Sequence, residues 1–117
     1  MSQRSLKVLA VNGESDPAET GSFIAMRDRG VDIKVLTWPG TFQHQMLEEA
    51  GVPTIPYVLR SKFSREGIRT IRRELKRTHY DVLHMLDKRG TMNGLWASIG
   101  IDVRLVAYRG IIGNVSY

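Results

Sequence analysis

The chain has 117 residues, of which 42% are hydrophobic and 25% charged, a composition typical of one soluble globular domain. It contains no cysteine, which excludes disulfide frameworks and thiolate metal sites and fits a reducing cytoplasm. No apolar run approaches the ~18 residues of a membrane span, and the first apolar run is too short for a signal peptide. We therefore expect a soluble cytoplasmic domain.

The net charge of +5 is unevenly distributed along the chain. Residues 1–59 hold five Lys/Arg and seven Asp/Glu, a net charge of −2. Residues 60–117 hold twelve Lys/Arg and five Asp/Glu, a net charge of +7. This asymmetry predicts a localised basic surface that faces an anionic partner.

Five short apolar runs predict five strands. They lie at residues 6–12, 31–38, 52–59, 80–86 and 103–108. Most of the runs are nearly continuous rather than alternating, as in strands that are buried on both faces of a parallel sheet. Helix signals separate each run from the next. The pattern favours a single α/β domain over residues 1–117, a Rossmann-like doubly wound parallel sheet with helices on both faces.

The first two helices have clear start and stop signals. The first is predicted to begin at Asp16-Pro17, an N-cap followed by a proline at the first helical position, and to end at Gly30. Its apolar residues are Phe23, Ile24 and Met26. The second is predicted over residues 41–50, with Gly51 ending it. Its expected buried face consists of Phe42, Met46 and Ala50.

The last two helices are predicted from their apolar stripes. The third begins near Ser64 and places Ile68, Ile71 and Leu75 on one stripe. The fourth follows the charged triplet at residues 87–89. Its i, i+3, i+4, i+7 spacing predicts a buried stripe of Met92, Leu95, Trp96 and Ile99.

Ligands of such sheets bind outside the carboxyl ends of the strands, where the strand order reverses. That rule points to five loops. They are Asn12-Gly13-Glu14-Ser15, Trp38-Pro39-Gly40, Arg60 to Phe63, Asp87-Lys88-Arg89-Gly90 and Arg109-Gly110. A plain polar turn explains each loop equally well, because strand-to-helix turns are commonly rich in glycine and polar residues.

The sequence motifs of several common ligand-binding and catalytic sites are absent from these loops. The first loop, NGESDPAETG, is not the G-x-G-x-x-G of a dinucleotide site, and no Gly-Lys-Ser/Thr of a P-loop is present. The acidic cluster and the lysine of a phospho-receiver domain are missing, as is a G-x-S-x-G elbow. The histidines lack ligand partners at metal-binding spacing, so no metal site is predicted. They are His44, His79 and His84.

The third helix carries the strongest compositional signal. Residues 60–77 contain eight Lys/Arg and two Glu. The basic residues predicted to share the face opposite the apolar stripe are Arg65, Arg69, Arg72, Arg73 and Lys76. This face is either a solvated helix surface or a surface that adheres to an anionic membrane, where each basic residue contributes about 1 kcal/mol. Nucleic acid is less favoured, because only Phe63 and Tyr80 lie nearby for base stacking.

Strand and turn patterns along the whole chain resemble the N-terminal domain of family 4 glycosyltransferases of the GT-B fold. The matching stretches are LKVLAVNG, a helix ending in Met26-Arg27-Asp28-Arg29-Gly30, VDIKVLTWPG, YDVLHMLDKRG and VRLVAYRG. The resemblance is diffuse and includes no single diagnostic motif. It implies sugar transfer from a nucleotide-sugar donor to a saccharide or lipid-linked glycan acceptor, without a further cofactor.

The family has two Rossmann-like domains, of which the N-terminal one mainly binds the acceptor. Because the chain matches only the first part of that domain, the resemblance implies a fragment that lacks the C-terminal donor domain and is inactive alone. It also implies a peripheral contact of the basic helix with the inner membrane face. From the residues alone, the alternative is a non-catalytic basic α/β module that docks on an anionic membrane or nucleic acid.

The resemblance also assigns substrate-binding positions, while the catalytic residues stay unknown. The segment Asn12-Gly13-Glu14 matches the loop after the first strand, which faces the interdomain cleft. Asp87-Lys88-Arg89 matches acceptor-side positions. Arg109-Gly110 stands where many members have a histidine, which puts a histidine-dependent role in doubt. An arginine at this position is suited to binding a phosphate with two hydrogen bonds.

Overall fold

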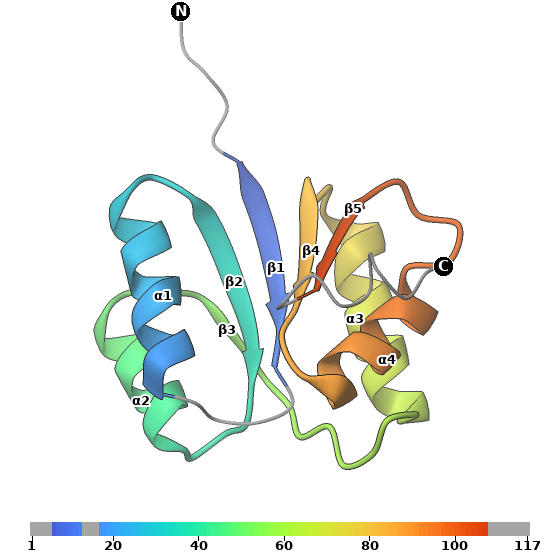
Figure 1. Ribbon diagram of the computed structural model, residues 1–117, viewed down its shortest axis with the longest axis horizontal. Coiled ribbons are helices and arrows are strands. Elements are labelled where there is room, and N and C mark those ends of the chain that lie inside the picture. The colour runs from blue at the N-terminus through green and yellow to red at the C-terminus, as the bar shows by residue number, and fades with distance from the viewer. Residues whose placement is uncertain (1–5, 13–16, 108–117) are drawn as a thin grey trace, which may run out of the picture.

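A computed structural model describes residues 6–12 and 17–107, and in these ranges helices alternate with strands (Figure 1). The elements are β1 (Lys7–Val11), α1 (Pro17–Asp28), β2 (Asp32–Thr37), α2 (Phe42–Glu49), β3 (Thr54–Pro56), α3 (Arg65–Arg77), β4 (Val82–Met85), α4 (Lys88–Ala97) and β5 (Arg104–Ala107). All neighbouring strands pair in parallel, in the order β3-β2-β1-β4-β5. The predicted α/β Rossmann-like sheet is confirmed.

The third strand is much shorter than the predicted run at residues 52–59. It spans Thr54–Pro56 and lies at the edge of the sheet. Proline has no backbone N–H, so Pro53 and Pro56 cannot donate to a ladder of hydrogen bonds. The carbonyl oxygen of Pro53 still accepts a hydrogen bond from the backbone N–H of Val35, at 3.0 Å. The prolines thus explain why β3 is a short edge strand.

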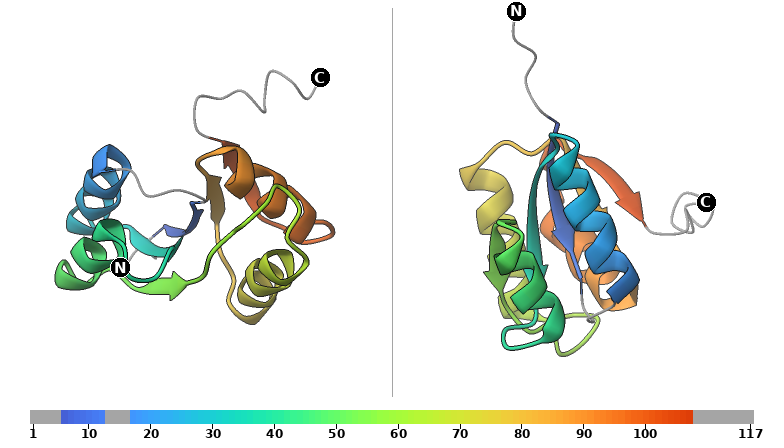
Figure 2. Two further views of the ribbon diagram at one scale, coloured as in Figure 1. Left: turned by 90° about the horizontal axis from the view of Figure 1, so that it is seen from below. Right: turned by 90° about the vertical axis from the view of Figure 1, so that its left-hand side faces the viewer.

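Two helices cover each face of the sheet (Figures 1 and 2). Under α1 and α2, the buried core contains Val8, Ala10, Phe23, Ile33, Val35, Leu47, Val52 and Leu86. Under α3 and α4, it contains Leu9, Val11, Leu36, Leu59, Ile71, Leu75, Tyr80, Leu83, Met85 and Ala97. Successive residues of β1 and β2 alternate between these two cores, which is why their apolar runs are nearly continuous.

The capping signals in the sequence determine most helix ends. Thr41 Oγ1 accepts the N–H of His44 at 3.3 Å, and Ser64 Oγ accepts the N–H of Gly67 at 3.2 Å. Gly30 and Gly51, with φ of 91° and 77°, have the left-handed conformation predicted for helix ends. The predicted N-cap Asp16 lies outside the described residues, and α1 begins at Pro17 as expected.

The predicted buried face of α2 is wrong. Phe42 is 61% exposed and Ala50 is also exposed, whereas Gln43 and Leu47 are buried. Gln43 is tolerated inside because its side chain amide has hydrogen-bond partners there. A buried polar residue thus rotates the helix away from the face that hydrophobicity alone predicts.

The predicted buried stripe of α4 is also wrong. Met92, Trp96 and Ile99 are 38%, 50% and 58% exposed, and Leu95 is half-buried. The helix instead buries small or polar residues, which are Gly90, Asn93, Gly94 and Ala97. A Cβ atom on Gly90 would lie 2.5 Å from the Val11 carbonyl oxygen. The helix therefore approaches the sheet too closely for large side chains on its inner face.

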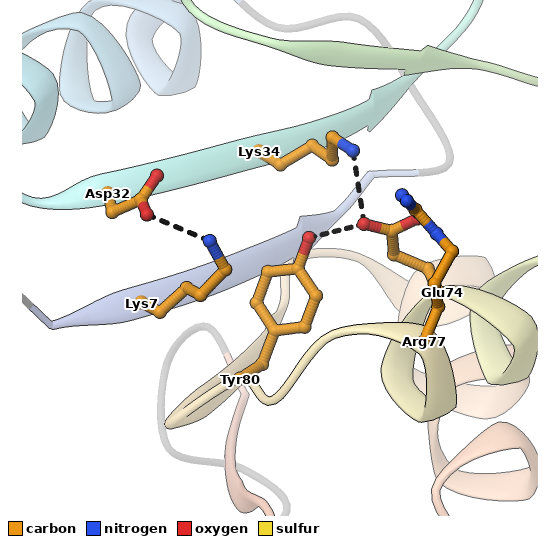
Figure 3. Close-up of polar contacts among 6 residues, drawn as sticks. All are labelled: Lys7, Asp32, Lys34, Glu74, Arg77 and Tyr80. Carbon is orange, nitrogen blue, oxygen red and sulfur yellow. Dashed lines mark hydrogen bonds and ion pairs between the residues drawn. The ribbon is translucent and has the colours of Figure 1, made fainter.

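A buried carboxylate holds α3 against the sheet (Figure 3). Glu74 pairs with Lys34 Nζ at 3.1 Å and with Arg77 Nη2 at 2.8 Å, and the hydroxyl of Tyr80 donates to it. Burial acts to raise the pKa of Glu74, but hydrogen bonds from Arg77, Tyr80 and Lys34 outweigh burial and lower that pKa to about 2. Glu74 is therefore ionised inside the fold at neutral pH.

The predicted basic face of α3 is exposed at Arg65, Arg69, Arg73 and Lys76. Arg72 differs, because its Nη1 donates to the carbonyl oxygens of Ala97 and Ile99, at 3.0 and 2.7 Å. Arg72 therefore ties the C-terminal end of α4 to α3. None of the helices within the described ranges combines the length and the apolar character needed to cross a bilayer.

Candidate functional site

The carboxyl ends of β1 and β4 meet at the point where the strand order reverses. The chain passes from β1 outward to β2 and β3 and then returns to the other side of β1 as β4. The N–H of Leu86 donates to the carbonyl oxygen of Val11 at 3.1 Å. The carboxyl ends of β1 and β4 therefore lie side by side at this switch point, where ligands bind in open α/β sheets.

A buried polar network fixes the end of β1. The side-chain oxygen of Gln43 accepts hydrogen bonds from Asn12 Nδ2 at 2.7 Å and from Thr37 Oγ1 at 2.6 Å. The Gln43 amide nitrogen donates to Thr20 Oγ1 at 3.0 Å. All four residues are at most 1% exposed. The network therefore joins β1, β2, α1 and α2 at this edge, and it gives Asn12 a positioning role.

The charged triplet begins α4 at the same edge. Asp87 is the N-cap, and its Oδ1 accepts the N–H of Gly90 at 2.7 Å. Arg89 is half-buried, and its Nη1 donates to the carbonyl oxygen of Leu59 at 3.3 Å. Lys88 is exposed. Asp87 and Arg89 thus also stabilise the local fold, while Lys88 presents a positive charge to solvent.

Asn93, a fully buried residue of α4, holds the loop before α3. Its Oδ1 accepts the N–H of Ser64 at 2.7 Å. Its Nδ2 donates to the carbonyl oxygens of Ser61 and Arg89, at 2.9 and 2.8 Å. One amide therefore fastens the loop that follows β3 to α4.

Trp38 follows β2 at this edge. Its indole Nε1 is buried and has no hydrogen-bond partner among the residues that the structure describes. At the opposite, amino edge of the sheet lies a hollow of about 590 Å³. Its lining includes the charged or titratable residues His79, Asp81, Asp102 and Arg104. The residues predicted to bind substrate are not among those that line this hollow.

The structure brings together two of the predicted site segments, Asn12 and the triplet at residues 87–89. Gly13, Glu14, Arg109 and Gly110 lie outside the described residues. Sequence reasoning missed the supporting polar residues at the edge, which are Thr20, Thr37, Gln43 and Asn93. Gln43 and Asn93 lie on the inner faces of α2 and α4, whereas hydrophobic periodicity predicted other faces, so the sequence pattern carried no signal for them.

The described histidines do not gather into a metal site. Within the described ranges there is no group of three or more His, Cys, Asp or Glu that could hold a metal ion. His44 accepts the N–H of Gly40 at Nδ1, so its Nε2 carries the proton toward Glu48 at 3.0 Å. Burial lowers the pKa of His84, which keeps this strand residue neutral at pH 7.

Comparison with known proteins identifies structural neighbours only. No protein-family profile and no curated protein sequence matches the chain. A glycosyltransferase from Rickettsia africae superposes with a TM-score of 0.74 at 14% identity, covering 90% of this chain and 30% of that one. For a putative UDP-N-acetylglucosamine 2-epimerase from Listeria monocytogenes, the TM-score is 0.65 at 16% identity, covering 89% of this chain and 30% of that one.

A third structure, MurG from Acinetobacter baumannii, superposes with a TM-score of 0.61 at 12% identity, covering 89% of this chain and 35% of that one. The chain shares the Rossmann-like fold of glycosyltransferase-type GT-B proteins. It spans about a third of the length of these structures. At such low identity the likeness establishes the fold alone.

Proposed function

We propose that the chain is the acceptor-side part of a glycosyltransferase of the family 4 type, which transfers sugar from a nucleotide-sugar donor to a saccharide or lipid-linked glycan. The observation that carries the proposal is the meeting of Asn12 and the triplet at residues 87–89 at the switch point of the sheet. The fold likeness to the Rickettsia africae glycosyltransferase supports it.

The described side chains at this edge suit a polar, hydroxyl-rich ligand. The carboxylate of Asp87 can accept hydrogen bonds from sugar hydroxyls in addition to the Gly90 N–H. The exposed ammonium of Lys88 can donate to hydroxyls or to a phosphate group. Asn12 acts indirectly, because its buried amide anchors the carboxyl end of β1.

The donor is assigned to a second domain beyond this chain. The proposed division of labour gives residues 1–117 the acceptor and gives the donor domain most contacts with the nucleotide-sugar. Glu14 and Arg109 complete the acceptor side of the cleft in this proposal, together with Gly13 and Gly110. Sugar transfer then requires both domains, because the proposed cleft is formed between them.

Nuclear magnetic resonance of the ¹⁵N-labelled chain tests the proposal. We expect a panel of oligosaccharides to shift the amide signals of Lys88, Arg89 and Gly90 in a saturable way. Uridine diphosphate and UDP-N-acetylglucosamine should have smaller effects, because the donor belongs to the other domain. Saccharide shifts at the amino edge, or donor binding without saccharide binding, would contradict the acceptor-side assignment.

A matched pair of variants locates the binding. Lys88→Ala should weaken saccharide binding about tenfold, the loss of one charge-assisted hydrogen bond. Arg29→Ala removes an equal charge from an exposed position after α1 and should leave the affinity unchanged. Equal effects of the two substitutions would mean that binding reflects net charge rather than this site.

A further inference from the structure

The exposed side of α4 and the loop before α3 form one apolar surface. The ring of Phe63 meets that of Trp96 edge to face, with centroids 5.6 Å apart, and both side chains are at least half exposed. Met92, Trp96 and Ile99 follow one another at i, i+4 and i+7, the spacing of one helical face. We call Phe63, Met92, Trp96 and Ile99 the apolar stripe. Aromatic and aliphatic side chains exposed together in this way mark an interaction surface.

A row of cations runs along the side of α3 that faces α4. The residues of this row, at i, i+4, i+7 and i+11, are Arg65, Arg69, Arg72 and Lys76. Arg72 shows which way the row faces, because its Nη1 donates to the carbonyl oxygens of Ala97 and Ile99, at 3.0 and 2.7 Å. The other three side chains are exposed beside it. We call Arg65, Arg69 and Lys76 the basic flank.

The apolar stripe and the basic flank run in the same direction, because α3 and α4 pack side by side (Figures 1 and 2). The backbone N–H of Ser64, before α3, donates to Oδ1 of Asn93, and Arg72, farther along α3, contacts the end of α4. At 1.5 Å per residue, residues 92–99 span about 10 Å and residues 65–76 about 16 Å. Two rows of this length match two adjoining sides of one helix of about three turns.

The opposing charge on this surface is small. Glu66 is the exposed carboxylate of α3, and its Oε2 lies 3.7 Å from Arg69 Nη1. The other carboxylate of α3, Glu74, is buried against Lys34 and Tyr80. The side of α3 next to the apolar stripe therefore keeps a positive potential, which attracts acidic groups and repels basic ones.

We propose that the apolar stripe and the basic flank bind an acidic amphipathic helix of a partner protein. The apolar side of that helix covers the apolar stripe, as amphipathic helices do when they lie in hydrophobic grooves. Its Asp and Glu side chains, on the adjoining side, pair with the basic flank and fix the orientation of the helix. This partner is additional to the proposed sugar transfer, which is assigned to the carboxyl edge of the sheet.

The exposure of the apolar stripe favours a protein partner over a bilayer or a nucleic acid. Met92 is 38% exposed and Trp96 is 50% exposed, so half or more of each side chain is packed against the fold. A partner helix can cover such side chains, whereas docking on a bilayer needs apolar groups that reach ~5–10 Å into the headgroup boundary. Bases stack on open ring faces, but the rings of Phe63 and Trp96 lie at 83° and pack on each other.

Fluorescence anisotropy with designed peptides tests the proposal on the whole chain. The probe is a fluorescein-labelled peptide of about four helical turns, with leucine at i, i+4, i+7 and i+11 and glutamate along one adjoining side. One control peptide has lysine in place of glutamate, and the other has the same composition in scrambled order. We expect saturable binding of the acidic peptide, at least tenfold tighter than that of either control. Equal binding of the acidic and scrambled peptides would refute the proposal.

Matched charge variants test the basic flank. Arg69→Gln with Lys76→Gln should weaken binding of the acidic peptide about tenfold, at about threefold for each lost pair. Arg27→Gln with Arg29→Gln makes the same charge change at exposed positions on the other side of the sheet and should change the affinity less than twofold. Equal losses would show that only net charge matters and would refute this surface. Arg69→Glu with Lys76→Glu should bind the lysine peptide more tightly than the wild type does.

Two further variants test the apolar stripe. Phe63→Ser with Ile99→Ser should weaken binding of the acidic peptide at least tenfold, because exposed apolar area is lost. Phe42→Ser removes an equally exposed ring from α2, on the other side of the sheet, and should leave the affinity unchanged. Circular dichroism melts establish that each variant is folded. An unchanged affinity in the folded double variant would rule out the apolar stripe as the binding site.

Intrinsic fluorescence detects the contact without altering the surface. The chain has two tryptophans, so Trp96 is the sole indole in the Trp38→Phe variant. We expect the emission of Trp96 to shift to the blue when the unlabelled acidic peptide is added, because the partner helix excludes water from the ring. Saturable peptide binding without such a shift would place the peptide elsewhere and overturn the proposal.

Other polyanions complete the test. Phosphatidylglycerol vesicles or a single-stranded RNA oligomer that binds this surface while the acidic peptide does not would replace the helix with that partner and refute the proposal. The outcome is independent of the proposed sugar transfer, because saccharide titration reports on the carboxyl edge of the sheet. Peptide binding without saccharide binding would refute the proposed function alone, and the reverse result would refute this inference alone.

Discussion

The glycines of α1 and α4 differ in how closely their backbone packs against the rest of the fold. Gly90 lies where a Cβ atom would approach the Val11 carbonyl oxygen to 2.5 Å. Gly21, in α1, has no described atom beyond its neighbours and its own helix backbone within 4 Å of its Cβ position. Gly94 is intermediate, since the nearest atom to its Cβ position is the flexible Met85 sulfur at 2.8 Å. We therefore expect an added methyl group to have opposite effects on stability at Gly90 and Gly21.

We predict that Gly90→Ala lowers the free energy of unfolding by about 2 kcal/mol, because backbone must move to accommodate the methyl group. Gly21→Ala should raise it by roughly 0.5–1 kcal/mol, the difference in helix propensity. Urea denaturation at neutral pH measures both. If the two alanines stabilise the protein equally, α4 is not as close to β1 as described.

Glu74 makes the stability depend on acid pH. Its pKa is about 2 in the folded protein and near 4.5 in the unfolded chain, so the unfolded state binds the proton first as the pH falls. The contribution of Glu74, about 3 kcal/mol in full, is present above pH 4.5 and is lost as the pH falls toward 2. This carboxylate thus stabilises the packing of α3 on the sheet most strongly in its ionised form.

Glu74→Gln should lower the unfolding free energy at pH 7, and the difference from the wild type should shrink toward pH 2.5. Chemical denaturation across this pH range measures the difference. Glu49→Gln, on an exposed part of α2, is the charge-matched control and should leave the unfolding free energy at pH 7 nearly unchanged. A constant gap between wild type and Glu74→Gln would contradict the pKa assignment.

At the scale of elements, strand and helix positions follow from local signals, whereas helix faces do not. The apolar runs and the caps at Thr41, Ser64 and Asp87 act within a few residues, so the sequence predicts the order and most boundaries correctly. Which residues form the inner face of α4 depends on how closely the helix approaches β1. Hydrophobic periodicity in the sequence does not reveal that distance.

Strand β5 is, like β3, an edge strand of the sheet in the described part of the chain. It pairs with β4 along one edge, while Leu105 and Val106, which point to opposite faces, are 42% and 39% exposed. No strand pairs with its other edge among the residues described. Such an edge is a template for pairing with another chain.

We therefore predict that the chain self-associates as its concentration rises. Val106→Lys should suppress this association, because a lysine on an edge strand disfavours pairing. Analytical ultracentrifugation over a concentration series measures the effect, with Ala50→Lys, at an exposed position after α2, as the charge-matched control. A single species at every concentration would contradict the prediction.

At the scale of the whole molecule, the sequence predicts the fold class and which strand ends carry the candidate site, because parallel strands place their carboxyl ends at one edge. It does not predict the polar residues that support that edge. Asn93 bonds to Ser64, 29 residues away, and Asn12 bonds to Gln43, 31 residues away. Such distant partners cannot be read from the sequence. Without them, burying an amide side chain is expected to be unfavourable, whereas in the structure its hydrogen bonds are satisfied.

The exposed side of α4 has a consequence for the proposed acceptor. Lys88 precedes Met92 by one helical turn, so the exposed face of α4 that carries Met92, Trp96 and Ile99 starts at the candidate site. Under the proposed function, a lipid-linked acceptor held at Lys88 would therefore have these apolar side chains within reach of its tail.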